Sequence, residues 1–196
     1  MFAILSSPKR GSGTSTTAAL LALTAANDRH TVLIDLAGDQ PALFNTPTMA
    51  GTIHVAPGLD LINAADLTIT EQITAITDID HQHHVVIDAG RHDHPIHQHL
   101  PANATAIWVL RPCYLALRRA VTLANRPNKV IVLNEPDRAL TERDIEEVLG
   151  VSVAATLDVH PDIARGVDAG LLTARPPRHA VRSLHAIVRA DEAVES

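Results

Sequence analysis

The sequence is poor in the residue types that stabilise small secreted proteins and aromatic cores. It has one cysteine, Cys113, among 196 residues, which excludes an internal disulfide framework and fits a reducing compartment. Aromatic residues make up 2% of the chain, whereas hydrophobic residues as a whole make up 46%. The core must therefore be built from Ala, Val, Leu and Ile, a composition that suits a sheet covered by alanine-rich helices.

The chain also lacks long apolar runs and an excess of positive charge. No apolar segment approaches the ~20 residues of a membrane span, and the opening MFAIL is too short for a signal peptide. Sixteen Lys and Arg stand against 22 Asp and Glu, a formal net charge of -6, which argues against nonspecific binding of nucleic acid. We expect a cytoplasmic protein with a single domain over residues 1–190 and a frayed tail over residues 191–196.

Short apolar runs alternate with helix-forming stretches along the chain. Strands are expected at 2–5, 31–36, 59–62, 85–88, 105–110, 129–133 and 151–157, and helices at 16–27, 69–77, 114–125, 141–149, 161–169 and 178–189. Residues 41–58 are rich in turn-forming residues and are expected to be irregular. The alternation indicates an α/β fold with a doubly wound, mostly parallel sheet flanked by helices.

The stretch SPKRGSGTST, residues 7–16, lies between the first expected strand and the first expected helix. Glycines in such a loop let backbone N–H groups approach phosphate oxygens, and the helix N-terminus adds partial positive charge. Phosphate-binding loops usually end Gly-Lys-Ser/Thr, and the lysine contacts the β- and γ-phosphates. Here Thr14 follows Gly13, so the stretch is either a phosphate-binding loop without its cation or an ordinary turn.

Two aspartates favour the phosphate-binding interpretation. Asp35 ends the apolar run TVLID, and Asp88 ends VVID. Ligands of open α/β sheets bind outside the C-terminal ends of strands. Carboxylates there hold Mg²⁺ and position an attacking water. A glycine-rich loop together with two such acids indicates a nucleotide site.

These motifs together resemble the ParA/MinD group of P-loop ATPases with a deviant Walker A motif, K-G-G-x-G-K-[ST]-T. The loop positions that match are Lys9, Gly11, Ser12, Gly13, Ser15 and Thr16. TVLIDLAGDQ resembles the strand that carries the group's first acid, HHVVIDAG resembles its Walker B strand, and KVIVLN resembles the strand that ends in an adenine-contacting asparagine. The residues carried over from these strands are Asp35, Asp88, Gly90 and Asn134.

Three positions depart from the group's pattern, the first being Arg10, which stands where the group has the first glycine of the loop. Thr14 stands where the group has the loop lysine, and Ala37 stands where it has a second aspartate; Asp39 lies two residues further on. A small residue in place of the lysine is similar to the loop of the pilus-localisation proteins TadZ and CpaE. The segment RPCYLALRRAV resembles the septum-site-determining-like branch.

The resemblance implies a MinD/ParA-like P-loop NTPase that binds ATP or ADP with Mg²⁺, weakly because the lysine is missing. The implied roles are catalysis for Asp35, Asp88 and Lys9; metal binding for Ser15 and Asp88; and nucleotide binding for Gly11, Ser12, Gly13, Thr14, Ser15, Thr16, Gly90 and Asn134.

The resemblance also implies a biological role. We expect a homodimer with Lys9 at its seam that recruits a protein partner in a pilus, secretion or division apparatus, at a pole or division site. Hydrolysis would be weak or absent, nucleic acid would not be a partner, and any membrane association would be indirect. The alternatives are an active ParA-type ATPase that partitions DNA and a scaffold that has lost nucleotide.

Histidines form two clusters in the sequence, and three arginines form another. Of twelve histidines, one group lies at 81, 83 and 84 and another at 92, 94, 97 and 99. We interpret them as solvated loop residues and expect no tight structural zinc, because no tetrahedral set with cysteine is available. Arg111, Arg118 and Arg119 are interpreted as one solvated helical face, the alternative being a basic face for DNA, anionic lipid or an acidic partner. Cys113 is expected to be a buried small hydrophobe.

Overall fold

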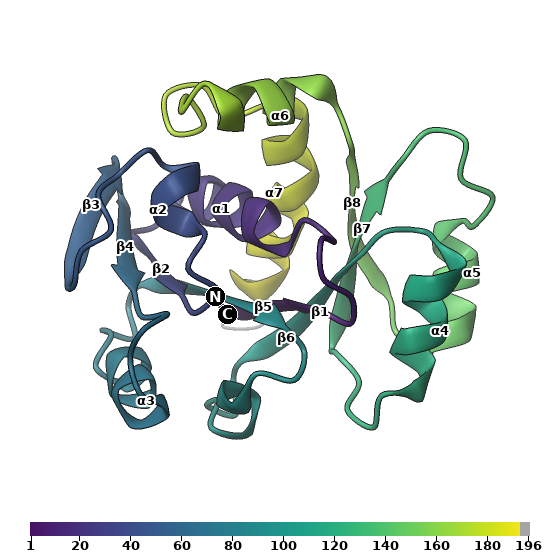
Figure 1. Ribbon diagram of the computed structural model, residues 1–196, viewed down its shortest axis with the longest axis horizontal. Coiled ribbons are helices and arrows are strands. Elements are labelled where there is room, and N and C mark those ends of the chain that lie inside the picture. Colours follow the sequence, from purple (N-terminus) through teal and green to yellow (C-terminus); the bar gives the residue numbers. More distant parts are fainter. Residues whose placement is uncertain (193–196) are drawn as a thin grey trace.

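The computed structural model describes residues 1–192, in which the strands form one eight-stranded sheet of order β3-β4-β2-β5-β1-β6-β7-β8 (Figure 1). Only the β3–β4 pair is antiparallel, so the doubly wound, mostly parallel sheet expected from the sequence is confirmed. The strands are β1 (Phe2–Ser7), β2 (Thr31–Asp35), β3 (Thr52–Ala56), β4 (Leu59–Asn63), β5 (His84–Arg91), β6 (Thr105–Leu110), β7 (Lys129–Asn134) and β8 (Val153–Asp158).

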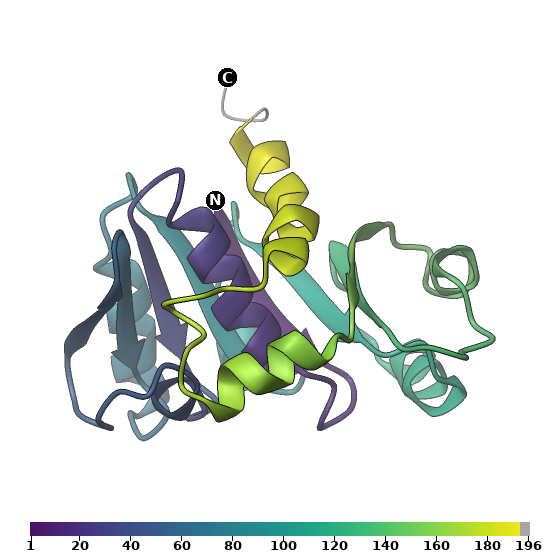
Figure 2. The ribbon, with the colours of Figure 1, turned by 90° about the horizontal axis from the view of Figure 1, so that it is seen from above.

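Helices cover both faces of the sheet. One face carries α1 and α7 and, beside them, α2 and α6 (Figure 2), and the other carries α3, η1, α4 and α5. The helices are α1 (Thr14–Ala25), α2 (Gln40–Leu43), α3 (Ile69–Thr77), the 3₁₀ helix η1 (Pro95–Gln98), α4 (Tyr114–Thr122), α5 (Glu142–Leu149), α6 (Pro161–Asp168) and α7 (Arg178–Glu192).

The core is aliphatic, as the composition requires. Helix α1 is enclosed between the sheet and α7, and Ala18, Ala19, Ala22 and Ala25 are wholly buried. Small side chains on every side of α1 let the helix approach both layers closely, which explains why its apolar residues follow no single stripe. The same close approach holds the start of α1 firmly against the ends of the central strands.

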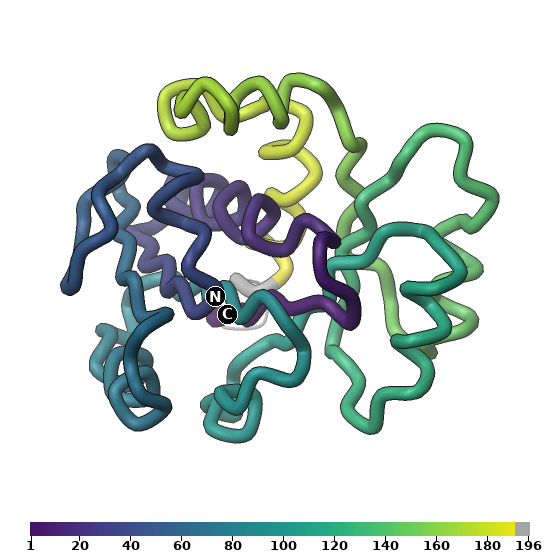
Figure 3. Tube along the Cα trace, in the orientation of Figure 1, coloured from purple at the N-terminus to yellow at the C-terminus, as the bar shows by residue number. Residues whose placement is uncertain are grey.

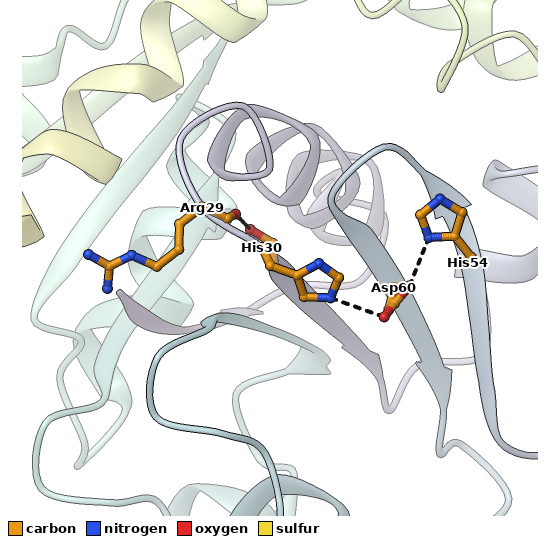
Figure 4. A network of polar contacts seen from close by, with 5 residues as sticks. Arg29, His30, His54 and Asp60 are labelled. Atoms are coloured by element: carbon orange, nitrogen blue, oxygen red, sulfur yellow. Dashed lines mark hydrogen bonds and ion pairs between the residues drawn. The ribbon is translucent and has the colours of Figure 1, made fainter.

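The expectation of irregular structure at 41–58 is wrong in part. Residues 40–43 form α2, and β3 pairs with β4 through a turn at Gly58. Strand β3 is an edge strand with half-exposed side chains, so it lacks the continuous apolar run that marks the buried strands. Asp60 on β4 ties this edge to the loop before β2, with its two oxygens 3.0 Å from His54 Nδ1 and His30 Nε2 (Figure 4).

The far end of the chain is helical for longer than expected. Helix α7 continues to Glu192, so residues 191 and 192 of the expected tail belong to it, while residues 193–196 lie outside the described residues. Within residues 1–192, no helix combines the length and the apolar character that crossing a membrane would need.

Candidate functional site: a phosphate-type loop and two cavities

The loop between β1 and α1 adopts a compact, glycine-dependent turn. Gly11 and Gly13 have φ angles of 73° and 82°, in the left-handed region that side chains strain. The hydroxyls of Ser7 and Ser12 both donate to the Lys9 carbonyl, at 2.8 and 2.6 Å, and so close the loop on itself. Helix α1 begins directly after Gly13, two residues earlier than expected, because this left-handed glycine turns the chain into the helix. The unpaired N–H groups of the first helical turn therefore start at Thr14.

A cavity of about 810 Å³ lies against this loop. Its other walls come from the end of β5 and from the segments after β2, β5 and β6, because parallel strands end at the same edge of the sheet. Figure 3 traces the course of the chain through these segments. Sequence-predicted site residues gather here. Those that line the cavity are Lys9, Gly11, Ser12, Gly13, Thr14, Ser15, Thr16 and Gly90.

The two predicted acids, Asp35 and Asp88, lie beneath the cavity rather than in its wall. They are register partners on β2 and β5, and both are wholly buried. Asp35 accepts backbone N–H groups from Ala37, Gly38 and Gln40 at 2.8–3.0 Å, so it shapes the turn after β2. Burial raises the pKa of Asp35 above its ordinary value, although these three N–H groups oppose the shift.

The surroundings of Asp88 shift its pKa away from that of an ordinary carboxyl group. Its oxygens accept the Gly90 N–H at 3.0 Å and the Gln40 side-chain amide at 2.8 Å. Burial, joined by the negative charge of Asp35, raises the pKa of Asp88 from 3.8 to about 6. Asp88 is therefore a buried group whose charge changes close to neutral pH.

Gln40 is a site residue that the sequence patterns missed. It is wholly buried, and its Nε2 donates to both Asp88 Oδ2 and the Ser15 carbonyl, at 2.8 and 2.9 Å. Its Oε1 is buried with no hydrogen-bond partner. The amide thus links the Asp88 strand to the start of α1. The only signal for it in the sequence is its place directly after Asp39 in the segment that follows Asp35.

Asp39 lies two residues beyond Ala37, the position at which the group that the sequence resembles has its second aspartate. Ser15 Oγ donates to Asp39 Oδ2 at 3.0 Å, while Ala37, at the family's own position, is an exposed part of the cavity wall. A hydroxyl next to a carboxylate suits a hydrated Mg²⁺, which prefers oxygen ligands and keeps several waters. No group of three His, Cys, Asp or Glu within residues 1–192 is placed to hold a metal. Mg²⁺ here would depend on phosphate oxygens and water.

A second, smaller cavity of about 290 Å³ adjoins the first. Gly13, Thr16 and Arg111 line both, and the rest of its wall comes from α1, from the ends of β7 and β8 and from α6, including Leu133 and Leu157. Asn134 does not line it, but its Nδ2 donates to Asp158 Oδ1 at 2.9 Å, and Asp158 does line it. Largely apolar walls with a few polar groups fit a flat organic ring such as a base.

The larger cavity, called the phosphate-side cavity to distinguish it from the smaller, base-side cavity, carries positive charge even though its loop lacks the lysine. Thr14 lines it as a neutral residue that is 6% exposed. The charged side chains in the wall are four basic ones (Lys9, Arg10, Arg91 and Arg111) and two acidic ones (Asp39 and Asp93). Arg91 is paired with Asp93, and Arg111 with Glu135, which leaves Lys9 and Arg10 against Asp39. The remaining balance favours an anion.

The histidine groups do not behave as one solvated loop. His84 is wholly buried, with its Nδ1 2.7 Å from the N-terminal ammonium of Met1, which corrects the expectation for this residue. His94 lines the phosphate-side cavity, and burial lowers its pKa and that of His97. Cys113 is half-buried at the start of α4 rather than a core residue.

The other arginines are placed differently. Arg118 and Arg119 are exposed on α4, as expected of a solvated helical face. Arg111 is not part of this helical face, because it lies in the wall of the larger cavity.

The sheet order, the glycine turn and the cavity at the strand ends define the fold of the ParA/MinD-type P-loop NTPases. The fold matches the MinD of Pyrococcus horikoshii solved with Mg-ADP (TM-score 0.77, 15% identity, covering 100% of this chain and 98% of that one). It also matches a ParA family ATPase of Chlorobium tepidum (0.70, 18%, 95% and 98%).

A third match is the MinC:MinD cell division complex of Aquifex aeolicus (0.77, 16%, 98% and 96%). No family model and no curated protein sequence matches the chain. At such low identities, the likeness shows the fold.

Proposed function

We propose that this chain is a ParA/MinD-like spatial regulator that binds ATP or ADP with Mg²⁺ weakly and hydrolyses ATP slowly or not at all. The observation that carries the proposal is the loop at 9–16, which keeps the glycine turn, the helix start and the cavity but has Thr14 in place of the lysine. The chain would act as a homodimer that recruits a protein partner.

Nucleotide binding is supported by the two adjoining cavities. The phosphate-side cavity offers loop N–H groups and a positive balance of charge, and the smaller one offers apolar walls for a base. Ser15 and Asp39 form an oxygen pair in the wall of the phosphate-side cavity, and the buried Asp88 directly precedes Ala89 of the same wall. The Mg-ADP bound by the similar MinD is in keeping with this assignment.

Weak hydrolysis follows from the neutral side chain at position 14. A lost charge-assisted contact costs about 1.5–3 kcal/mol, or roughly 10- to 100-fold in affinity. The penalty on the chemical step is larger, since charge builds up on the phosphoryl oxygens in the transition state. In a protein of this kind, the binding of nucleotide would matter more for function than its hydrolysis.

Dimerisation and partner recruitment rest on the resemblance and on the place of Lys9. Lys9 is half-buried and lines the open phosphate-side cavity, from which the family's early lysine crosses to the partner's phosphates. The similar MinD occurs in a complex with MinC. The loop without lysine favours a role in the positioning of a pilus or secretion apparatus, like TadZ and CpaE, with septum placement as the neighbouring choice.

The experiment combines calorimetric titration of ATP–Mg²⁺ with steady-state phosphate release, on the natural chain and on Thr14→Lys. Thr14→Lys should strengthen ATP binding at least 10-fold and restore hydrolysis less, because Ala37 still lacks the family's carboxylate. Thr77→Lys, on an exposed position outside the cavity, is the control for added charge. Turnover of the natural chain at the rate of an ordinary ParA enzyme would overturn weak hydrolysis, and absence of binding at millimolar ATP would favour the nucleotide-free scaffold.

A further inference from the structure

Arg111 occupies a position from which it can reach a bound phosphate chain. Strand β6 lies beside β1 in parallel, with Trp108 opposite Ser6, so the residues after Leu110 run alongside the loop that follows Ser7. Of the four basic residues in the wall of the phosphate-side cavity, Arg111 alone also lines the base-side cavity. It therefore stands where the two cavities meet.

The Arg111 guanidinium is held in place with donor capacity left over. Its Nη1 donates to Glu135, directly after β7, and its Nε is buried with no hydrogen-bond partner. Glu135 also accepts from Arg138, at 2.7 Å from Nε, and this second contact together with the charge of Arg111 lowers the pKa of Glu135. Two guanidinium groups share one carboxylate, so the cluster keeps a net positive charge.

The other basic residues are less well placed. Arg91 is paired with Asp93, and Arg10 is exposed at the rim of the loop. Lys9 belongs to the stretch that the family uses across its dimer. Arg111 combines a fixed position, an unsatisfied buried donor and contact with both cavities.

We propose that Arg111 supplies, within the same chain, the positive charge that Thr14 leaves out, by binding the nucleotide's phosphates where the two cavities meet. This inference rests on the proposed nucleotide binding and adds the residue that makes such binding workable. A planar guanidinium contacts phosphate oxygens through two N–H groups, whereas a lysine acts as a point charge. Because Arg111 approaches from the base side, it holds the inner phosphates and does not follow the transferring one.

The test measures calorimetric affinities of ATP–Mg²⁺, ADP–Mg²⁺ and adenosine for the natural chain, Arg111→Gln and Arg111→Lys. Arg111→Gln should weaken ADP and ATP by about 10- to 100-fold and adenosine by less than about 3-fold. Arg111→Lys should give an intermediate loss for ADP. Arg118→Gln removes the same charge from an exposed position on α4 and should change none of the three affinities.

A double-mutant cycle tests whether Arg111 takes the role of the lysine that is missing at position 14. In a Thr14→Lys background the loop has its own cation, so Arg111→Gln should weaken ADP several-fold less than it does in the natural chain. Arg138 continues to pair with Glu135 after the change, and circular dichroism checks the fold. If Arg111→Gln does not fold, the loss of ADP affinity in Arg111→Lys decides the question.

Two results overturn different claims. ADP affinities of the natural chain, Arg111→Gln and Arg111→Lys that agree within about 2-fold would refute the role of Arg111 and leave nucleotide binding intact. A natural chain that binds neither ATP nor ADP at millimolar concentration would overturn the proposed function, and with it the role of Arg111.

Discussion

Replacing Asp88 by Asn should raise the free energy of unfolding relative to the natural chain. This gain should be larger at alkaline pH than at acid pH. The pKa of Asp88 is raised from 3.8 to about 6, so the folded chain binds this proton more tightly than the unfolded chain does. The stability that this proton contributes is complete below pH 3.8 and is lost as the pH rises through about 6. At pH 8 the buried charge costs about 3 kcal/mol, since each pKa unit corresponds to ~1.4 kcal/mol.

The structure also supplies the opposing cost of the substitution. An asparagine oxygen can still accept the Gly90 N–H, but its NH₂ group faces the NH₂ of Gln40. Gln40 must then turn its amide, which gives its unpaired Oε1 a partner and breaks the bond from its Nε2 to the Ser15 carbonyl. That lost bond costs about 1 kcal/mol. The net gain at pH 8 is therefore about 2 kcal/mol, or about 4–8 °C in Tm.

Urea denaturation followed by circular dichroism at pH 5, 6.5 and 8 measures the effect. The advantage of Asp88→Asn should grow by about 1.5 kcal/mol between pH 5 and pH 8, because Asp88 in the natural chain ionises over this interval. Asp66→Asn, in an exposed turn, is the matched control and should show no such growth. A stability difference that stays constant with pH would refute the raised pKa of Asp88.

Three further predictions concern the loop and its cavities. Lys9→Ala should weaken a nucleotide-promoted dimer, measured by light scattering with and without ATP; a chain that stays monomeric in both conditions contradicts the dimer itself. If Asn134 contacts the base, ATP and ADP should bind more tightly than GTP in competition titrations, and equal affinities would remove Asn134 from the site. Gly13→Ala should destabilise the fold by about 1–3 kcal/mol, because its Cβ would lie 2.6 Å from Leu133 Cδ1 at a left-handed φ; an unchanged urea midpoint would show that Leu133 yields freely.

Most of the sheet could be predicted from the sequence, because buried parallel strands are continuous apolar runs. β2, β5 and β6 stand within a few residues of their expected bounds for that reason. Strand β3 was beyond such prediction, since an edge strand with half-exposed residues lies within a segment rich in turn residues. Its pairing with β4 is a tertiary contact that no local pattern records.

The site residues that are contiguous in the sequence could be predicted. Those that reach the site through packing between separate strands could not. The loop residues at 9–16 are contiguous, and the structure brings them to one cavity. Gln40 and Asp39 reach this loop only because the turn after β2 folds against the start of α1, which depends on the buried Asp35. Arg111 looks like part of a solvated helix in the sequence, because the pattern does not tell which residue after a strand end faces the neighbouring loop.

The central place of β1 in the sheet also determines when the chain can fold during synthesis. β1 leaves the ribosome well before its two neighbours, β5 and β6, which begin only at His84 and Thr105. At 5–20 residues per second, β1 and the loop after it wait roughly 5–20 s for both partners to be made. Throughout that interval the two edges of an apolar strand are unpaired, which exposes the nascent chain to aggregation and to chaperones. Nucleotide cannot shorten the wait, since the walls of its cavity do not yet exist.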